Sequence, residues 1–542
     1  MIKRKVNIPI FIGLSIVVGI FIGSTFNYKN KSVLFSSNSN EVKIKKLINY
    51  IQYDYVDEVD TDSLLDDAIT NMLVKLDPHS VYIPKEELQQ VTENMQGKFV
   101  GIGVSFLMYH DSVTVTSVIE GGPSERAGLK VGDRIIIADK DTLFGESIIK
   151  KAKIKESEIG TFAGNRKINE AVIKSLKGEP DTNVDISVYR RSTNQILEIP
   201  ITRGEVSIKS VPSFYMINKT LGYIEVNRFA RTTYDEFKVA LDKLISEGMK
   251  SLILDLRGNP GGFMDIAEKI VDEFLEDGKL IVFTKNKNGE VNKSYATSNG
   301  DFENGKVYVL INQNSASASE IVAGALQDND KGIIVGRRSF GKGLVQQEMD
   351  LGDGSAVRLT TSRYYTPTGR SIQKPYNSKD TKAYNNDYIE RMHNGELISK
   401  DSIKVDDHLK YTTPKGKVVY GGGGIIPDVF VPIDTLNSFS NRLYGRLNDF
   451  VFKYVDNHRE EMNKWKLEDF IKNFDKDNKI FNTYLKQLNL KNPISEKNGE
   501  NIKIYFKALV ARNLFGETGY LKVVQKKDNM ILKVLELEKS TN

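Results

Sequence analysis

Three serines at alternate positions are the first residues of this chain that could do chemistry. They lie in Ser315–Glu320, between an apolar run at 307–311 that predicts a buried strand and a run at 321–326 that predicts a short helix. Backbone N–H groups at a helix start lack partners inside the helix, and the helix dipole favours negative charge there. A serine so placed could be a nucleophile beside an anion site. On these residues alone, a helix N-cap is the favoured interpretation.

Two other mechanisms find little support in the sequence. Residues 336–343 match most of a phosphate-binding P-loop, but Gly343 stands where a hydroxyl residue should hold Mg²⁺. A strand pattern, and not a helix, also follows Lys342. A Ser-His-Asp hydrolase is disfavoured because the chain has no G-x-S-x-G motif and none of its 5 His lies in a catalytic motif.

A third mechanism is a serine activated by a lysine, which acts as a base only when its amine is neutral. Burial away from water lowers a lysine pKa and supplies that neutral amine. Lys342 lies between two glycines and two residues after Phe340, with no carboxylate beside it in sequence. By residue type alone, a lysine is nevertheless expected to be a solvated surface charge.

Length and composition limit the remaining classes. With 542 residues the chain is too long for one core, so we expect roughly three or four domains. A net charge of +5 over this length does not argue for nucleic-acid binding. The absence of Cys excludes disulfides and cysteine chemistry. No His pair has ligand spacing, so we interpret His79 as structural and expect neither a metal nor another cofactor.

The first segment predicts a membrane anchor. Residues 1–5 are basic and residues 6–26 are nearly all apolar or small, a length that approaches a membrane span. The basic flank should stay cytoplasmic, so we predict a signal anchor over 1–28 that holds the rest outside the inner membrane, on the periplasmic side. A cleaved secretory signal is the alternative, because Gly23–Thr25 could be a cleavage site. A polar tether follows over 29–41.

Two helices and a PDZ-like region come next. Helical spacing at 42–51 and 65–76 predicts an N-terminal helical region over 42–95. Residues 96–205 then show a glycine loop, strands, a helix over 168–177 and a hairpin over 184–201. A small antiparallel barrel could carry such glycines, but their order resembles a PDZ domain.

In the PDZ family a glycine-bearing loop offers N–H groups to a C-terminal carboxylate, and the peptide adds as a strand. The resemblance assigns this loop to Gly101, Ile102, Gly103 and Val104. The stretch from 143 to 166 is longer than the family usually has, which leaves the far wall of the pocket undefined.

Residues 206–435 change to an α/β pattern. Strands are predicted at 221–226, 251–256, 332–336, 344–348 and 356–361. A helix is predicted between the first two strands, and another follows the second. The strand ending at Leu256 leads through a glycine turn into a helix, which is a ready anion site. Residues 436–542 read as helical and lysine-rich, with packing or partner binding as the expected role.

Taken in order, the motifs resemble those of the carboxyl-terminal processing peptidases, also called tail-specific proteases. The match spans roughly residues 42–432. The ordered motifs, besides the PDZ set, are Leu76–Tyr82, Asp255–Gly262, Ser315–Glu320, Phe340–Gln346, Ser362–Gln373 and Gly424–Asp428. The resemblance implies a multidomain α+β protein. Its α/β (ClpP/crotonase-like) serine protease core would carry an inserted PDZ domain, N-terminal helices and a C-terminal helical extension.

The resemblance also assigns roles to single residues. Ser317 corresponds to the nucleophile, Lys342 to the general base and Gln346 to the residue that orients the lysine. The backbone N–H of Ala318, with one from Gly261 or Gly262, corresponds to the oxyanion hole. By this reading a neutral lysine takes the serine proton as the hydroxyl attacks a peptide carbonyl.

The implied function is a serine endopeptidase that cleaves protein substrates near a free, flexible C-terminus. The PDZ domain would capture that C-terminus and can also gate the active site. The helical extension could bind an adaptor, mediate self-association, or only pack. The alternative is a catalytically silent PDZ scaffold, against which the joint presence of Ser317, Lys342 and Gln346 argues.

Overall fold

The computed structural model describes residues 39–109, 112–158, 161–377, 381–433, 441–488 and 496–541. The chain divides into two compact units, Met1–Leu73 and Val74–Asn542. The predicted anchor over 1–28 lies outside the described residues, as does most of the tether. From residue 39 onward, no helix of the described part is long and apolar enough to cross a membrane.

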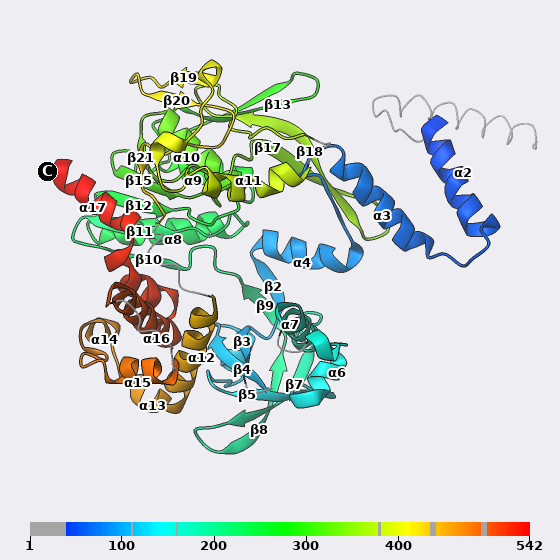
Figure 1. Cartoon of the computed structure of the whole chain (residues 1–542), viewed down its shortest axis with the longest axis vertical. Coiled ribbons are helices and arrows are strands. Elements are labelled where there is room, and N and C mark those ends of the chain that lie inside the picture. Colours follow the sequence, from blue (N-terminus) through cyan, green and yellow to red (C-terminus); the bar gives the residue numbers. More distant parts are fainter. Residues whose placement is uncertain are drawn as a thin grey trace, which may run out of the picture. The chain divides into compact units, whose positions relative to one another are not determined.

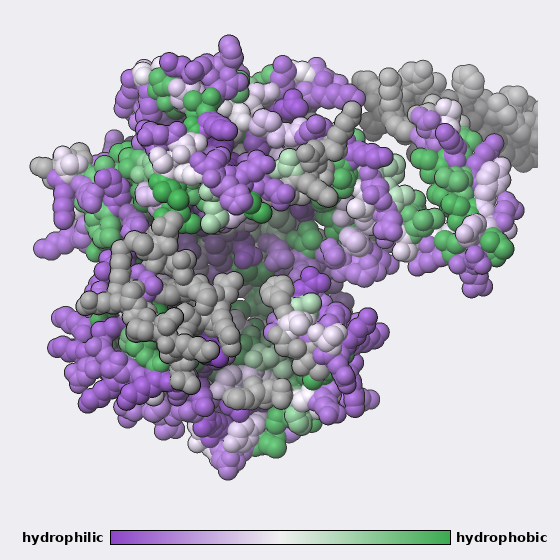
Figure 2. Space-filling view, in the orientation of Figure 1, coloured by the Kyte–Doolittle hydropathy of each residue, from purple (hydrophilic) through white to green (hydrophobic). Residues whose placement is uncertain are grey.

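The first unit contains the two predicted N-terminal helices, α2 (Ser39–Asp54) and α3 (Thr61–Val74). Their apolar side chains remain largely in contact with water, and Figure 2 shows the apolar surface along α2 in green. Leu47, for example, is 58% exposed, whereas Leu73 is buried. Two helices alone cannot enclose a core, so the amphipathic pattern predicted helices correctly without predicting burial.

The PDZ-like region is built on an antiparallel sheet with helices beside it (Figure 1). In sheet order its strands are β3 (Val104–Tyr109), β4 (Ser112–Val118), β5 (Arg134–Ala138), β7 (Asn183–Arg190) and β8 (Gln195–Thr202), with β6 (Asp141–Thr142) paired to β5. Its helices are α5 (Pro123–Arg126), α6 (Gly145–Lys151) and α7 (Phe162–Leu176). The strand β3 is at the edge of this sheet. The predicted helix at 168–177 begins earlier, at Phe162.

The α/β region forms a second six-stranded sheet. Its order is β10 (Ser213–Met216), β11 (Leu221–Glu225), β12 (Ser251–Asp255), β15 (Lys306–Ile311), β16 (Gly332–Gly336) and β21 (Val429–Phe430). All neighbouring strands are parallel except the antiparallel pair β10–β11. The carboxyl ends of β12 and β15 therefore meet at one edge, which brings the glycine turn after β12 beside the serines after β15.

Helices cover both faces of this sheet. Alternate strand residues on one face pack against α8 (Thr233–Ser246), α9 (Met264–Asp272) and α10 (Ala318–Asp328). Tyr223 and Tyr308 point to the opposite face, where they pack with α17 (Asn529–Thr541). The helix α17 therefore packs as part of the α/β core.

A third sheet lies beside the predicted lysine motif. It consists of β1 (Val81–Ile83), β18 (Ala356–Tyr365), β13 (Leu280–Asn286), β14 (Val291–Tyr295) and β17 (Leu344–Asp350). β18 pairs with both β1 and β17, so the segment after Pro78 lies one strand away from β17, the strand that follows Lys342. The helix α4 (Lys85–Gln96) closes the predicted helical region over 42–95. The sequence did not predict α11 (Thr381–His393), β19 (Lys410–Thr412) or β20 (Val418–Tyr420).

The remaining tail forms a helical body with its own core. Its helices are α12 (Asn441–Asn457), α13 (Arg459–Met462), α14 (Leu467–Asn473), α15 (Lys479–Leu488) and α16 (Glu496–Val524). Leu447, Val451 and Val455 share one buried face of α12. They pack with aromatic residues that include Phe470 and Phe506. The α16 helix is kinked at Gly516, where φ is 69°.

Candidate active site

Ser317 is the N-cap of α10, directly after the turn that ends β15. Its φ of 56° and ψ of −115° are unusual for a residue with a side chain, and such strain costs on the order of 1–3 kcal/mol. Ser317 is half-buried, whereas Ser315 and Ser319 are fully buried. The Ser315 hydroxyl donates to the Leu256 carbonyl at 2.8 Å, and that of Ser319 donates to the Asn259 carbonyl at 3.0 Å. The two flanking serines are therefore structural.

A buried carboxylate joins this turn to the lysine segment. Glu320, in the first turn of α10, is 0% exposed. Its Oε2 accepts the backbone N–H of Ser317 at 2.9 Å and that of Lys342 at 2.8 Å. Its Oε1 accepts the N–H of Gly341 at 2.7 Å and the hydroxyl of Ser339 at 2.5 Å. One side chain thus holds two segments together that lie apart in sequence.

Burial and hydrogen bonding act on the Glu320 carboxyl in opposite directions. Burial raises its pKa above the usual value, and the four hydrogen bonds lower it by a smaller amount. Three of the four donors are backbone N–H groups, which can only donate, so these contacts stabilise the charged form of the carboxyl in place of water.

Lys342 is half-buried, in contrast to the solvated charge expected from residue type alone. Burial lowers the pKa of its amine, and the cationic Arg358 lowers it further. The charges of Glu320 and Asp77 act in the opposite direction. The Lys342 Nζ donates to Gln346 Oε1 at 2.8 Å. A strand, β17, follows Lys342, which agrees with the argument against a P-loop.

Gln346 is in turn held by the segment around His79. Its Nε2 donates to the His79 carbonyl, and the His79 ring nitrogen Nε2 lies 2.6 Å from the Tyr384 hydroxyl. Asp77 accepts the N–H of His79 at 2.8 Å and thereby shapes this loop. Burial and the Lys342 cation lower the pKa of His79 to about 4. His79 is a structural residue, as predicted, and it supports the glutamine.

The glycine turn after β12 approaches the Ser317 turn closely. At Gly261 the φ is 101°, and a Cβ there would lie 2.7 Å from the Ser317 Cβ and 3.0 Å from the Ala318 nitrogen. Only glycine fits this contact. The Gly261 N–H donates to Asn259 Oδ1 at 2.8 Å. Ala318 is the first residue of α10, so its N–H has no partner inside the helix. A Cβ on Gly262 would collide with the Phe229 carbonyl.

In the PDZ-like region, the predicted binding loop directly precedes β3. Gly103 has a φ of 78°, and the Ile102 carbonyl accepts the N–H of Ser124 at 2.9 Å. Val104 is half-buried and packs against the core of this region. Phe106 and Met108 follow on the same side of the strand and are also only partly buried.

Two residues of the site were not assigned a role from the sequence. Glu320 is one of them, although the pattern from Ser317 to Glu320 is a capping-box signature that could have found it. The other is Tyr364 of β18, which is 1% exposed and donates to the Lys342 carbonyl at 2.7 Å. Its hydroxyl is also 3.2 Å from the Ser317 carbonyl. Among the described residues, no group of His, Asp and Glu side chains could hold a metal ion.

Comparison with known families follows the same division of the chain. The model of peptidase family S41 matches residues 220–382, and that of a PDZ domain matches residues 100–160. The N-terminal domain of the activating protease CtpB matches residues 23–87. A family of unknown function matches residues 440–516, in the helical tail.

Several curated proteins are similar over most of their length. A carboxy-terminal-processing protease of Bartonella bacilliformis is 32% identical over 366 residues, which cover 66% of this chain and 79% of that protein. A Staphylococcus aureus protein named as a CtpA-like serine protease is 33% identical over 397 residues, covering 70% and 74%. Among solved structures, the photosystem II D1 C-terminal processing protease is 25% identical, covers 74% of this chain and 89% of that one, and has a TM-score of 0.36.

Proposed function

Because the chain belongs to the carboxy-terminal-processing proteases of peptidase family S41, we propose that Ser317 and Lys342 are its catalytic dyad. The chain is a serine peptidase that carries a PDZ domain. One observation supports the dyad above the others. A single oxygen, Glu320 Oε2, accepts the backbone N–H of both Ser317 and Lys342, at 2.9 and 2.8 Å.

In the proposed reaction, neutral Lys342 takes the proton of the Ser317 hydroxyl as it attacks a peptide carbonyl. The lowered pKa of Lys342 increases the fraction of neutral amine at a given pH. Gln346 accepts a hydrogen bond from the amine and so directs it. An acyl-enzyme forms, the amine of the departing peptide takes the proton, and water then releases the acyl group.

The oxyanion of the tetrahedral intermediate needs donors next to Ser317. In this proposal the Ala318 N–H is one donor, and the Gly261–Gly262 turn supplies the other. The close approach of Gly261 to Ser317 and Ala318 supports this assignment. A donor of this kind is worth about 3 kcal/mol in other enzymes.

The substrate would be held by its free C-terminus in the PDZ domain. The N–H groups of the loop Gly101–Val104 would receive the carboxylate, and the peptide would add to the free edge of β3. The preceding chain would then reach Ser317. With the predicted anchor at 1–28, this would take place outside the inner membrane.

The dyad is tested by incubating residues 29–542 with an unstructured protein and following its cleavage by gel and mass spectrometry. Ser317→Ala and Lys342→Ala should both abolish cleavage. The matched control is Lys331→Ala, because Lys331 is also a half-buried lysine whose pKa burial lowers. This variant should keep its activity. Cleavage that survives both dyad substitutions would end the proposal.

A further inference from the structure

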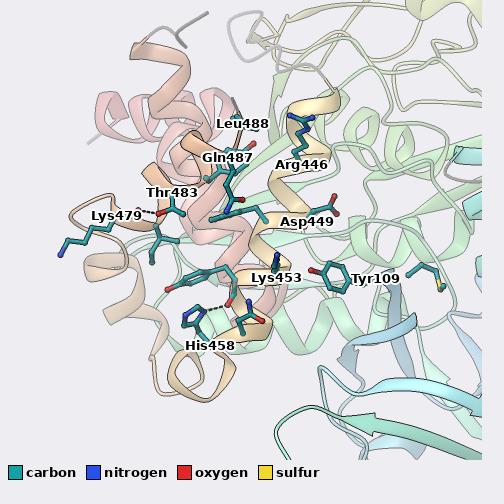
Figure 3. A pocket seen from close by; sticks show the side chains of 15 residues that line it. Tyr109, Arg446, Asp449, Lys453, His458, Lys479, Thr483, Gln487 and Leu488 are labelled. Carbon is teal, nitrogen blue, oxygen red and sulfur yellow. Dashed lines mark hydrogen bonds between the residues drawn. The ribbon is translucent and has the colours of Figure 1, made fainter. Parts of the chain in front are cut away.

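A groove lies between the helical tail and the end of β3 (Figure 3). Its volume is about 920 Å³. Met108 and Tyr109, the last residues of β3, line one side of it, and residues of α12 and α15 line the rest. The groove therefore opens where the edge strand of the PDZ-like sheet ends.

The direction of a captured peptide is set by the place of the proposed carboxylate loop. That loop precedes Val104, so the C-terminal residue of a substrate would lie at the start of β3. A peptide paired with β3 from this end must run antiparallel to it. Its upstream residues would pass Met108 and Tyr109 after about six positions and enter the groove.

The tail is held against this end of the PDZ-like sheet. Asp456, near the end of α12, pairs with Arg134 of β5 at 3.4 Å and with Arg191 at 3.2 Å. The Asp456 side chain is only 4% exposed. The rings of Tyr109 and Phe452 pack edge to face, with their centroids 4.9 Å apart. These contacts keep the groove next to the end of β3.

Cations outnumber carboxylates along the groove, because Arg446, Lys453 and Lys479 line it and Asp449 is its one acidic lining residue. Arg446 and Lys453, two turns apart on α12, are exposed and project from the helix together with Asp449 (Figure 3). Within the described ranges, neither cation forms an ion pair with a carboxylate. Phe450 and Tyr454 add apolar ring surface on the same side of α12. Such a surface suits carboxylate side chains with apolar or aromatic neighbours.

We propose that this groove binds the substrate segment that lies more than six residues upstream of the captured C-terminus, and that it selects acidic residues there. The proposal rests on the proposed capture of the C-terminus by the PDZ domain. It gives the helical extension a role in substrate choice, separate from the packing of α17. The pairs it would form are exposed, so salt should weaken the selection.

The test uses the full chain with Ser317→Ala, which binds substrate without cleaving it. Two fluorescent peptides share the same last six residues and carry either glutamates or lysines in the six residues before them. Anisotropy should give a Kd that is about threefold to tenfold lower for the glutamate peptide, with the difference shrinking at high salt. Adding Lys453→Glu should remove or reverse that preference. The matched control Lys486→Glu makes the same change on an exposed lysine of α15 outside the groove, and should leave it unchanged.

Two further readouts separate this proposal from the one on which it rests. Peptides with an amidated C-terminus should bind much more weakly; if they bind equally well, capture by the PDZ domain is wrong. If the free carboxylate is required but both peptides bind alike, or Lys453→Glu and Lys486→Glu behave alike, the groove has another occupant and this inference is wrong. The thermal midpoints of both variants verify that they are folded.

Discussion

Replacing Glu320 by glutamine probes the contact that joins the two halves of the proposed dyad. The substitution preserves shape but turns one of the two oxygens into an NH₂ donor. Whichever oxygen is lost, at least one backbone N–H of Ser317, Gly341 or Lys342 then faces another donor, whereas the Ser339 hydroxyl can turn to accept. Hydrogen bonds to a charged group contribute about 1.5–3 kcal/mol each, so Glu320→Gln should lower the free energy of unfolding by about 3–5 kcal/mol.

The same substitution should reduce activity more than it reduces the folded fraction. The Ser317 and Lys342 backbones share Glu320 Oε2, and a displacement on the order of 1 Å between reacting groups can cost about 100-fold in rate. We therefore expect kcat/KM on an unstructured protein to fall by about 100-fold under conditions where the variant is folded.

The control for this experiment is Glu268→Gln on α9. Glu268 is a partly buried carboxylate, whereas Glu320 is fully buried, and Glu268 accepts a hydrogen bond from Ser294 at 3.0 Å. Its substitution should cost no more than about 1 kcal/mol and leave kcat/KM within about twofold. If Glu320→Gln unfolds at the same urea midpoint as Glu268→Gln and cleaves equally fast, the role given to Glu320 is wrong.

Three further predictions concern Lys342, His79 and the helix α17. Because burial and Arg358 lower the pKa of Lys342, kcat/KM should rise with pH to a plateau with a midpoint below 10.5. Arg358→Gln should move that midpoint upward. An unmoved midpoint in a pH–rate titration would show that Arg358 does not lower the pKa of Lys342. His79 has its pKa lowered to about 4 against an unfolded value near 6.5, so stability is fully present above about pH 6.5 and is lost as pH falls through 4. The loss should be about 3 kcal/mol in urea unfolding. His79→Gln should remove this dependence of stability on pH, and an unchanged dependence in the variant would refute the prediction. Deleting residues 529–541 would expose the sheet face covered by Met530, Ile531 and Val534 and should cost roughly 5 kcal/mol; an unchanged unfolding midpoint would show that α17 is dispensable.

Most elements of the peptidase core could be predicted because each one has a clear apolar pattern within its own segment. The strands β12, β15 and β16 are continuous apolar runs, and α10 follows one of them after a serine-rich turn. Parallel strands place their carboxyl ends at one edge, so the meeting of the Gly261 turn with Ser317 follows from topology. The α11 helix was missed because its sequence is mostly polar and has little apolar periodicity. The α4 helix lies within the predicted helical region over 42–95, but its apolar residues Leu88, Val91 and Met95 were not singled out.

The contacts that assemble the site were harder to predict because each joins distant segments. Tyr364 reaches the Lys342 carbonyl only through the pairing of β17 with β18. Gln346 contacts His79 only because β1 adds to that same sheet. The groove beside Tyr109 combines β3 with α12, although the whole peptidase core lies between these two elements in the sequence. Periodicity within one segment carries no information about such pairs.

The central claim is that Lys342 activates Ser317, and acyl-enzyme trapping measures this directly. The enzyme is mixed with an activated ester, quenched at intervals, digested, and examined by mass spectrometry for the acylated serine. We expect the acyl group on Ser317 alone. The rate of acylation should rise with pH as Lys342 loses its proton, and Lys342→Met should slow acylation by several orders of magnitude. Acylation of Ser315 or Ser319, or an unchanged rate in Lys342→Met, would contradict the claim.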